Sequence, residues 1–280
     1  MRTIRYTTLL LMLILSISTG AAAQMDTKTP IDITVNGKYI LFDVSPFMIS
    51  GTTYVPVRFI SGALGAERVS WNEGERTAVI EFGGRTLALP TGENHAYLDG
   101  RYMNMNGGAI LYRDRTFVPV RFIAETMGAD VLWKGDCFTV AITRQGINVP
   151  DSLVWERGFD DIDLYWMARV IEAEASGESF EGKLAVGAVV INRVASSEYP
   201  NTVYGVIFDR MHGVQFEPVI NGTIHNNPSY DSLVAAKRSL MGENNIGKCL
   251  YFFNPRIAES TWIARNRVYS LSIGNHDFYL

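Results

Sequence analysis

Residues 164–194 read LYWMARVIEAEASGESFEGKLAVGAVVINRV, in which carboxylates lie between two strongly apolar stretches. Apolar residues at helical spacing predict the buried stripe of a first helix, formed by Leu164, Ala168, Ile171 and Ala175. At about 100° per residue, Glu174 falls roughly 60 to 80° round the helix from this stripe, at the edge of the core. A carboxyl group there loses hydration, which raises its pKa and lets it hold a proton near neutral pH. The stretch therefore predicts an α-helical core that carries a general acid.

A second helix is expected over residues 180–194, after Gly177 interrupts the first. Its run from residue 184 to residue 191 is apolar nearly all round, so we expect it to be the central buried helix behind the acid. Strand-like composition returns at residues 251–253 and 278–279, which predicts a small sheet on one side of a cleft. The C-terminal half therefore reads as an α+β domain.

The same stretch resembles the catalytic signature of the SleB/CwlJ cell wall hydrolase family. The shared elements are an alanine, an arginine, a Gly-Glu-Ala-like tripeptide and a Gly-Glu pair, here Ala168, Arg169, residues 173–175 and residues 177–178. The resemblance continues in order through residues 181–186, 192–194, 215–222, 252–255 and 273–279. The chain departs from the family pattern at Ala173, where glycine is common, and at Glu217, where a small or polar residue is expected.

The resemblance implies a lysozyme-like fold and lytic transglycosylase chemistry, in which one glutamate acts first as acid and then as base. Glu174 is the proposed proton donor to the leaving oxygen. The C6 hydroxyl of muramic acid then closes a 1,6-anhydro ring without water, so that one essential carboxylate suffices. Glu178 is a candidate second carboxylate for a true muramidase. A residue just beyond a helix-breaking glycine is equally well explained as a helix cap or a solvated charge.

Other polar and aromatic residues of the C-terminal half are candidates for binding peptidoglycan. Amide side chains can hydrogen-bond its N-acetyl groups or stem peptides, at Gln215, Asn221 and Asn254. Aromatic rings can line a glycan groove, at Tyr251, Trp262 and Tyr279. His276 is the histidine best suited to a site. Each has a structural alternative, since asparagines form turns, aromatic rings pack in cores and a loop histidine can bond to backbone.

The N-terminal half is a duplicated unit. Val-Pro-Val-Arg-Phe-Ile occurs at residues 55–60 and again, 63 residues further on, at residues 118–123. Trp71 and Trp133 are 62 residues apart, so the second copy has lost one residue before its tryptophan. Each copy reads as short strands, then a helix, then strands around the tryptophan. Two copies too short to bury a core alone are expected to pack about a pseudo-two-fold axis as one α+β domain.

This pair resembles the repeat module named after the N-terminal domain of copper amine oxidases, which is often attached to exported enzymes of Gram-positive bacteria. The name implies no oxidase activity, because a copper site needs several imidazole ligands and residues 27–145 contain only His95. We expect the module to hold the enzyme on a wall polymer or a protein partner, with a structural spacer as the alternative. Tyr39, Tyr97 or Tyr102 can stack on sugars if exposed, or pack half-buried.

The chain is expected to leave the cytoplasm. Residues 1–23 combine Arg2 and Arg5 with an apolar run and three alanines before Gln24, the layout of a signal peptide. The run is too short to span a bilayer comfortably, so we expect no stable membrane anchor after cleavage. We therefore expect the protein to be secreted to the cell wall or spore envelope of a Gram-positive-type bacterium. The expected divisions are a signal peptide at 1–23, the duplicated domain at 27–145 with repeats at about 31–90 and 94–145, a linker at 146–160 and the hydrolase domain at 161–280.

Charge and motif content argue against several other classes. Residues 1–23 hold two arginines and no acidic residue, so their removal takes the formal net charge from −4 to −6. An acidic chain without a basic block disfavours nucleic acid as a partner. The absence of a His-Glu-x-x-His pair and of a Gly-x-Ser-x-Gly elbow disfavours a zinc amidase and a serine hydrolase, and no metal or cofactor is expected. Cys137 and Cys249 are far apart in sequence, so a disulfide is not expected.

These observations predict a two-domain α+β protein, a secreted enzyme that cleaves peptidoglycan between N-acetylmuramic acid and N-acetylglucosamine. The spore cortex, degraded at germination, and the vegetative wall are both candidate substrates. Two alternatives stay open: an amidase that cuts the bond from muramoyl to L-alanine, and a non-catalytic wall-binding scaffold.

Overall fold

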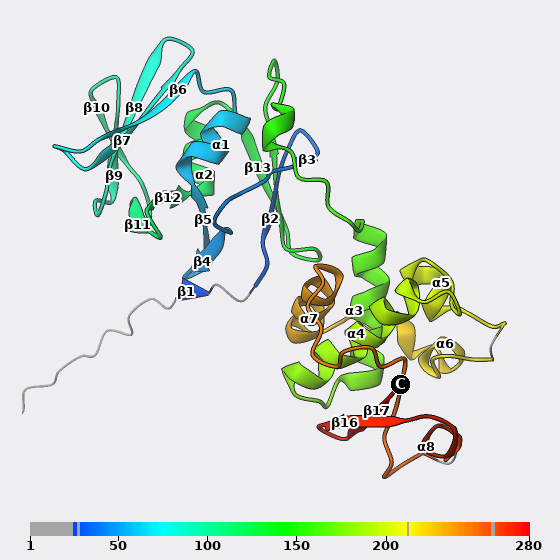
Figure 1. The fold of residues 1–280 in the computed structure, drawn as a ribbon. Coiled ribbons are helices and arrows are strands. Elements are labelled where there is room, and N and C mark those ends of the chain that lie inside the picture. The colour runs from blue at the N-terminus through cyan, green and yellow to red at the C-terminus, as the bar shows by residue number, and fades with distance from the viewer. Residues whose placement is uncertain (1–24, 27–28, 212, 259–260) are drawn as a thin grey trace, which may run out of the picture.

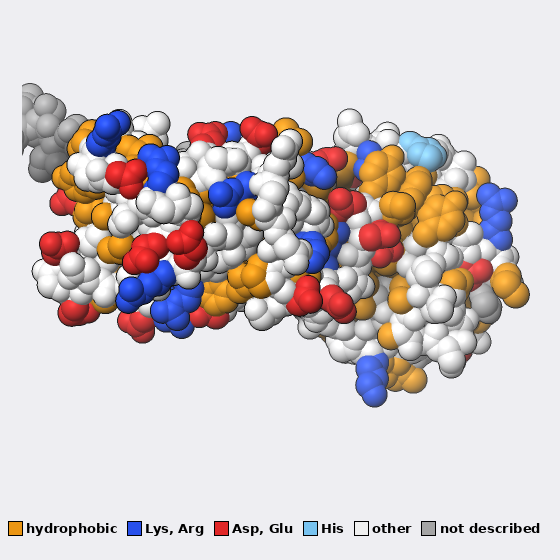
Figure 2. Space-filling model, turned by 90° about the horizontal axis from the view of Figure 1, so that it is seen from above, with side chains coloured by type: hydrophobic (Ala, Val, Ile, Leu, Met, Phe, Trp, Pro, Cys, Tyr) orange, Lys and Arg blue, Asp and Glu red, His pale blue; other side chains and the backbone are white. Residues whose placement is uncertain are grey.

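The computed structural model describes residues 25–26, 29–211, 213–258 and 261–280. Figure 1 shows two lobes side by side, a β-rich N-terminal lobe in blue to green and a mainly helical C-terminal lobe in green to red. Both lobes combine helices with sheets, which confirms the predicted α+β class. Figure 2 shows acidic and basic side chains interspersed over the N-terminal lobe on the face in view. The signal peptide expected at residues 1–23 lies outside the described residues.

The two repeats of the N-terminal lobe meet at a pseudo-two-fold axis. Strand β5 (Thr52–Pro56) of the first copy pairs antiparallel with β12 (Arg115–Pro119) of the second. Val55 lies opposite Val118, its own equivalent in the other copy, and both side chains are fully buried. Residues that pair with their own equivalents mark a two-fold axis, so the copies pack as the duplication predicted.

Each Val-Pro-Val segment ends a strand and starts a short helix. Pro56 is the last residue of β5 and directly precedes α1 (Val57–Ala63), and Pro119 stands in the same position between β12 and α2 (Val120–Thr126). A proline at the end of a strand removes no hydrogen bond from the middle of the sheet. Gly65 follows the first helix with a φ of +81°, a left-handed conformation that glycine adopts without strain.

The two copies also exchange strands. β2 (Asp32–Val35) of the first copy pairs in parallel with β14 (Thr139–Thr143) of the second, while β9 (His95–Leu98) of the second pairs with β8 (Arg85–Pro90) of the first. The sheets of this lobe are ordered β1-β4-β5-β12-β11, β10-β9-β8-β7-β6 and β13-β14-β2-β3. The remaining strands are β1 (Met25–Asp26), β3 (Lys38–Tyr39), β4 (Phe47–Ile49), β6 (Arg68–Asn72), β7 (Thr77–Phe82), β10 (Arg101–Asn104), β11 (Ile110–Tyr112) and β13 (Asp130–Lys134).

Three helices that pack on one another form the core of the C-terminal lobe: α3 (Asp161–Ala175), α4 (Phe180–Ala195) and α7 (Tyr230–Leu240). Every residue of α4 from 182 to 190 is buried, as its apolar run predicted. An antiparallel sheet ordered β15-β17-β16 lies beside them, from strands β15 (Tyr251–Phe253), β16 (Tyr269–Ile273) and β17 (His276–Tyr279). Shorter segments are η1 (Asp151–Leu153), α5 (Val203–Ile207), α6 (Pro218–Asn221), η2 (Thr223–His225) and α8 (Trp262–Asn266).

Polar side chains hold both ends of α3. At its start Asp160 accepts hydrogen bonds from two backbone N–H groups of the first turn, and the Asp163 carboxylate accepts one from the Asp160 backbone. This capping box satisfies donors that a helix start otherwise leaves unpaired. At its end the buried Lys183 ammonium of α4 donates to the carbonyls of Ala175 at 2.7 Å and Ser176 at 3.0 Å. The last turn of α3, which carries the predicted acid, is thereby fixed against α4.

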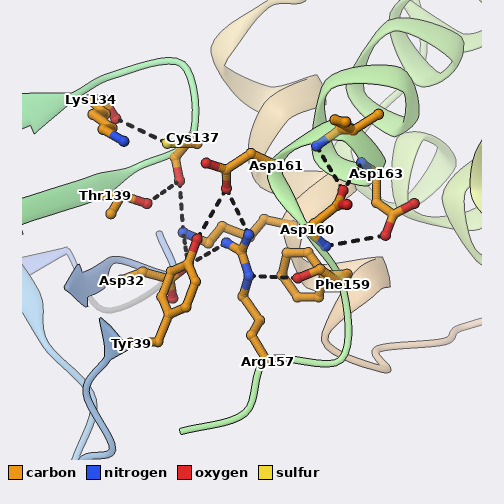
Figure 3. Close-up of polar contacts among 12 residues, drawn as sticks. Asp32, Tyr39, Lys134, Cys137, Thr139, Arg157, Phe159, Asp160, Asp161 and Asp163 are labelled. Atoms are coloured by element: carbon orange, nitrogen blue, oxygen red, sulfur yellow. Dashed lines mark hydrogen bonds and ion pairs between the residues drawn. The ribbon is translucent and has the colours of Figure 1, made fainter. Parts of the chain in front are cut away.

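A buried ion cluster joins the two lobes (Figure 3). Lys237 of α7 is fully buried, and its ammonium lies 2.9 Å from the carboxylate of Asp32 in β2. Arg157, in the segment between the lobes, places its guanidinium 3.0 Å from the same carboxylate and 2.7 Å from that of Asp161. Lys237 also donates to two backbone carbonyls between β13 and β14, at 2.9 and 3.2 Å. The lobes therefore share a polar core and not only a covalent connection.

Tyr39, a candidate for sugar stacking, lies in this junction. The Arg157 guanidinium lies 4.2 Å from the centre of its ring, and its hydroxyl donates to Asp161 at 3.1 Å. Burial raises the pKa of this hydroxyl to about 12. Tyr39 is thus half-buried in packing contacts, the alternative given for it, whereas Tyr97 and Tyr102 are exposed on β9 and β10.

Candidate active site

A cleft of about 1320 Å³ opens on the C-terminal lobe, with walls from α3, α4, α6 and β15. It brings together most of the residues that the sequence suggested: Glu174, Gln215, Asn221, Tyr251, Asn254, Trp262 and His276. The folded chain adds others that carry charge or hydroxyl groups, namely Arg193, Tyr199, Glu217 and Arg267. Segments far apart in the sequence thus meet around one cavity.

Glu174 lies in the last turn of α3 with its side chain partly buried. Burial raises its pKa to about 7, the carboxylate of Glu217 adds to the rise, and the charge of Arg193 opposes it. A carboxyl group with this pKa exists in both protonation states near neutral pH. It can therefore give a proton to an oxygen of a bound molecule and later accept one.

Arg193 is a buried cation in the wall of the cleft. Its side chain belongs to the last turn of α4, and its Nε donates to the carbonyl of Leu250 at 2.8 Å. The guanidinium lies 5.1 Å from the centre of the Tyr199 ring. Its Nη1 is buried and has no hydrogen-bond partner among the described residues. A buried charged donor without an acceptor in the protein is available to water or to a bound molecule in the cleft.

Aromatic rings and a second arginine form another part of the wall. Burial and the hydrogen bond with Tyr251 raise the pKa of Tyr199 to about 12, so this hydroxyl stays protonated. The Arg267 guanidinium lies 4.4 Å from the centre of the Tyr251 ring and 5.3 Å from that of Trp262. The Trp262 side chain is 52% exposed. An exposed indole in the wall of the cleft is a surface to which a sugar ring can bind.

His276 lies at the start of β17 and is buried. Burial lowers the pKa of its imidazole, while the charge of Glu178 opposes this effect, so the ring is neutral at neutral pH. Its Nδ1 has no hydrogen-bond partner within the described part of the chain. The structure therefore places His276 in the cleft wall as a neutral donor or acceptor.

Two of the suggested residues do not line the cleft. Glu178 accepts hydrogen bonds from the backbone N–H of Asn275 at 3.0 Å and from its side chain at 2.8 Å, so it braces the turn between β16 and β17. Burial acts to raise the pKa of Glu178, but these hydrogen bonds outweigh it and the pKa is lowered. Tyr279 is buried and its ring stacks on Phe253 at 5.6 Å. Glu178 therefore holds a turn through hydrogen bonds, and Tyr279 packs in the core, the structural alternative given for the aromatic candidates.

Two functional groups were missed as site residues. Arg193 is a charged residue at the end of an otherwise apolar buried helix, and that unusual position is the signal that identifies it. Glu217 was noted only as a departure from the family pattern, and it lies just before α6, where it faces the cleft as a second carboxylate. Neither its position nor its effect on Glu174 follows from sequence spacing.

The described residues carry neither a metal-binding cluster nor a membrane-spanning helix. No three side chains of histidine, cysteine, aspartate or glutamate come together there in an arrangement suited to a metal ion. No helix in the same part of the chain has both the length and the apolar character needed to cross a bilayer.

Comparison with known families gives two matches that together cover most of the described chain. Residues 34–142 match the copper amine oxidase N-terminal domain, and residues 177–279 match the cell wall hydrolase family. The class of protein follows: the chain combines a segment that matches the copper amine oxidase N-terminal domain with a segment that matches the cell wall hydrolase family, and both predicted resemblances are confirmed.

Within this class the curated relatives carry a more particular name. A spore cortex-lytic enzyme of Bacillus cereus is 37% identical over 135 residues, 48% of this chain and 48% of the relative. One of Bacillus subtilis is 36% identical over 121 residues, 43% of this chain and 38% of the relative. The chain thus spans about half the length of the curated relatives it matches or less.

Two solved structures are also similar. The catalytic domain of the germination-specific lytic transglycosylase SleB from Bacillus anthracis is 36% identical, with 45% of this chain and all of that chain covered, at a TM-score of 0.41. The catalytic domain of the Bacillus cereus SleB protein is 37% identical, with 45% of this chain and 94% of that chain covered, at a TM-score of 0.40.

Proposed function

We propose that this protein degrades peptidoglycan by cleaving its glycan strand between N-acetylmuramic acid and N-acetylglucosamine, as a lytic transglycosylase. The observation that carries the proposal is Glu174, a carboxyl group with a pKa of about 7 in the wall of a large cleft. The names of the relatives, spore cortex-lytic enzymes, support the spore cortex as the form of peptidoglycan that is degraded.

Glu174 serves both halves of the proposed reaction. Its proton goes to the glycosidic oxygen as the bond from that oxygen to C1 of muramic acid breaks. The C6 hydroxyl of the same sugar then attacks C1, and the Glu174 carboxylate takes the hydroxyl proton. A 1,6-anhydro ring forms, no water is consumed, and Glu174 is protonated again for the next cycle.

Arg193 supports the charged state of the acid. Its charge opposes the rise in the pKa of Glu174, so it stabilises the carboxylate that exists between the two proton transfers. Its buried Nη1 can donate to an oxygen of the bound glycan. Arg193 acts on the reaction through Glu174 and the substrate, so it is proposed as a positioning residue.

The other cleft residues bind the polymer in this proposal. Gln215, Asn221 and Asn254 hydrogen-bond its N-acetyl or peptide groups, and Tyr251 and Trp262 contact sugar rings. Export through the signal peptide at residues 1–23 brings the enzyme to this substrate. N-terminal sequencing of the exported protein tests the last point, with Gln24 expected as the first residue.

Hydrolysis is the second candidate outcome, and Glu217 favours it. This carboxylate faces the same cleft and is close enough to raise the pKa of Glu174. Two carboxyl groups across a glycosidic bond can activate water, which is the arrangement of a true muramidase. Glu217 thereby replaces Glu178 as the candidate second carboxylate.

Mass spectrometry of the products released from purified cortex and vegetative sacculi distinguishes these outcomes. The protein should release fragments that end in anhydromuramic acid, and Glu174→Gln should lower the rate by roughly 10²- to 10⁴-fold. Glu178→Gln is the matched control outside the cleft and should give the same products. Reducing ends that disappear with Glu217→Gln would establish hydrolysis. Free stem peptides would identify an amidase, and turnover unaffected by Glu174→Gln would identify a scaffold.

A further inference from the structure

The duplicated domain carries two grooves that are equivalent under its pseudo-two-fold axis. The first has a volume of about 650 Å³ and is lined by α1, β6 and the β11–β12 hairpin. The second has a volume of about 580 Å³ and is lined by α2, β13 and the β4–β5 hairpin. Most lining positions of one groove correspond to lining positions of the other at the repeat offsets of 63 or 62 residues. The domain therefore contains two equivalent grooves, one for each repeat.

Each groove needs both copies of the repeat. The helix and the tryptophan strand come from one copy, and the hairpin that closes the groove comes from the other. The central pairing of β5 with β12 brings each hairpin across the axis to the opposite helix. Figure 1 shows β12 near β5 and both short helices of the N-terminal lobe, and β12 contacts β5, α1 and α2. The grooves are thus a property of the assembled domain.

The same two chemical groups recur in both grooves. Trp71 and Trp133 each have 40% of their surface exposed, so each indole is accessible to a molecule in its groove. An exposed arginine lies in each groove with the indole. Arg58 lies in the first groove, and Arg121 lies in the second, where its Nη1 also donates to the Glu125 carboxylate and to the Val131 carbonyl, each at 3.2 Å. The closing hairpins have diverged, since Arg115 stands where the other copy has Thr52. Both grooves therefore have an indole and a guanidinium, although the residues of their closing hairpins differ.

We propose that these twin grooves bind sugar units of a peptidoglycan glycan strand. The ligand rests on the proposed function, because it is the polymer that the C-terminal lobe is proposed to cut. The face of an indole is electron-rich, and the C–H groups of a pyranose ring carry a small positive charge, so the two stack. The guanidinium donates hydrogen bonds to the carboxylates and amide carbonyls that peptidoglycan carries beside its sugars.

Two equal grooves suit a polymer made of repeated units. A strand that occupies one groove presents identical units to the second, and the second contact forms at a high effective concentration. The buried Asp32, Lys237 and Arg157 cluster fixes the grooves relative to the catalytic cleft. The N-terminal lobe therefore holds the insoluble substrate while the C-terminal lobe cuts it.

Binding of the full chain to purified, insoluble sacculi tests this proposal, with Glu174→Gln present throughout so that the polymer stays intact. Trp71→Ala and Trp133→Ala should each weaken binding by roughly tenfold, and the double variant by roughly a hundredfold. Leu132→Ala is the matched control, because Leu132 is a 61% exposed hydrophobic residue next to Trp133 in β13 that lines neither groove. Thermal unfolding of each variant checks that the domain is intact.

A second pair of variants and a second assay make the result independent of folding and of catalysis. Arg58→Gln with Arg121→Gln keeps both indoles and should also weaken binding. In the catalytically intact chain, the tryptophan double variant should cleave short soluble glycans at the normal rate and insoluble sacculi more slowly. Sacculus binding by the tryptophan double variant that equals binding by Leu132→Ala would overturn the proposal, as would a parent chain that binds no sacculi. A chain that binds through the grooves but cleaves nothing would refute only the proposed function.

Discussion

At the scale of single residues, the acidity of Glu174 is set by its surroundings and not by its own chemistry. Removal from water is the main cause of its raised pKa, and two neighbours of opposite charge, Glu217 and Arg193, act on it in opposite directions. The position of Glu174 at the edge of an apolar stripe is visible in the sequence, because helical periodicity places it there. The two neighbours come from other segments, so their influence becomes visible only in the folded chain.

Replacement of Glu217 by glutamine should shift the pH dependence of cleavage towards lower pH. Loss of this negative charge removes one of the causes that raise the pKa of Glu174. The acid then loses its proton at a lower pH. The fall in kcat/KM on the alkaline side of the profile therefore begins at a lower pH than in the unchanged protein. A pH profile of kcat/KM on soluble glycan fragments measures this shift.

Glu198→Gln is the control for that profile, since Glu198 also lines the cleft but is not among the charges that shift Glu174. Its profile should match that of the unchanged protein. An alkaline limb that stays in place in Glu217→Gln, or moves to higher pH, would contradict the electrostatic assignment.

At the scale of elements, the helices were easier to predict than the turns that join them. The apolar periodicity of α3 and α4 and the break at Gly177 are local signals, and the structure has helices at Asp161–Ala175 and Phe180–Ala195. The roles of Glu178 and Tyr279 were harder, because Glu178 depends on how the β16–β17 turn folds back on the α3–α4 connection, and Tyr279 depends on how β17 pairs with β15. Side chains directed by tertiary contacts leave no periodic signal in the sequence.

Replacement of Glu178 by alanine should destabilise the C-terminal lobe without changing the products. The variant loses the two hydrogen bonds that Glu178 accepts from Asn275, and about 1 kcal/mol of unfolding free energy is expected to go with them. Chemical denaturation measures this loss, and Glu181→Ala, at an exposed position in the first turn of α4, is the control. A change from anhydro to other products in Glu178→Ala would instead restore it as a catalytic group.

At the scale of the whole molecule, the two lobes should unfold together. The sequence predicted two domains joined by a linker at residues 146–160, and the structure adds a buried ion pair between them, formed by Lys237 and Asp32. Burial lowers the pKa of Lys237, and the Asp32 carboxylate counteracts that effect. The two residues lie in different lobes and belong to no common sequence motif, so their pairing could not be predicted from the sequence.

Removal of one partner from this cluster should be costly. Asp32→Ala leaves the ammonium of Lys237 buried without its counter-ion, and a loss of roughly 3 kcal/mol in unfolding free energy is expected. The double variant with Lys237→Met should recover part of that loss, because no charge then remains buried. Differential scanning calorimetry measures both, and a single transition is expected for the unchanged protein.

Lys38→Ala is the comparison, because Lys38 and Asp151 form an exposed ion pair at 3.6 Å. It should change the unfolding free energy by less than about 1 kcal/mol. Equal effects of Asp32→Ala and Lys38→Ala, or two separate transitions in the unchanged protein, would show that the buried cluster does not couple the lobes.

The pairing of Val55 with Val118 also has an evolutionary meaning. In a symmetric homodimer, a residue on the axis meets its own copy from the second subunit. The N-terminal lobe has this geometry within one chain, so it is the arrangement that gene fusion of a dimer of single repeats produces. Fusion makes assembly independent of protein concentration. It also frees the two halves to mutate separately, so that one ancestral surface can become two surfaces with different preferences.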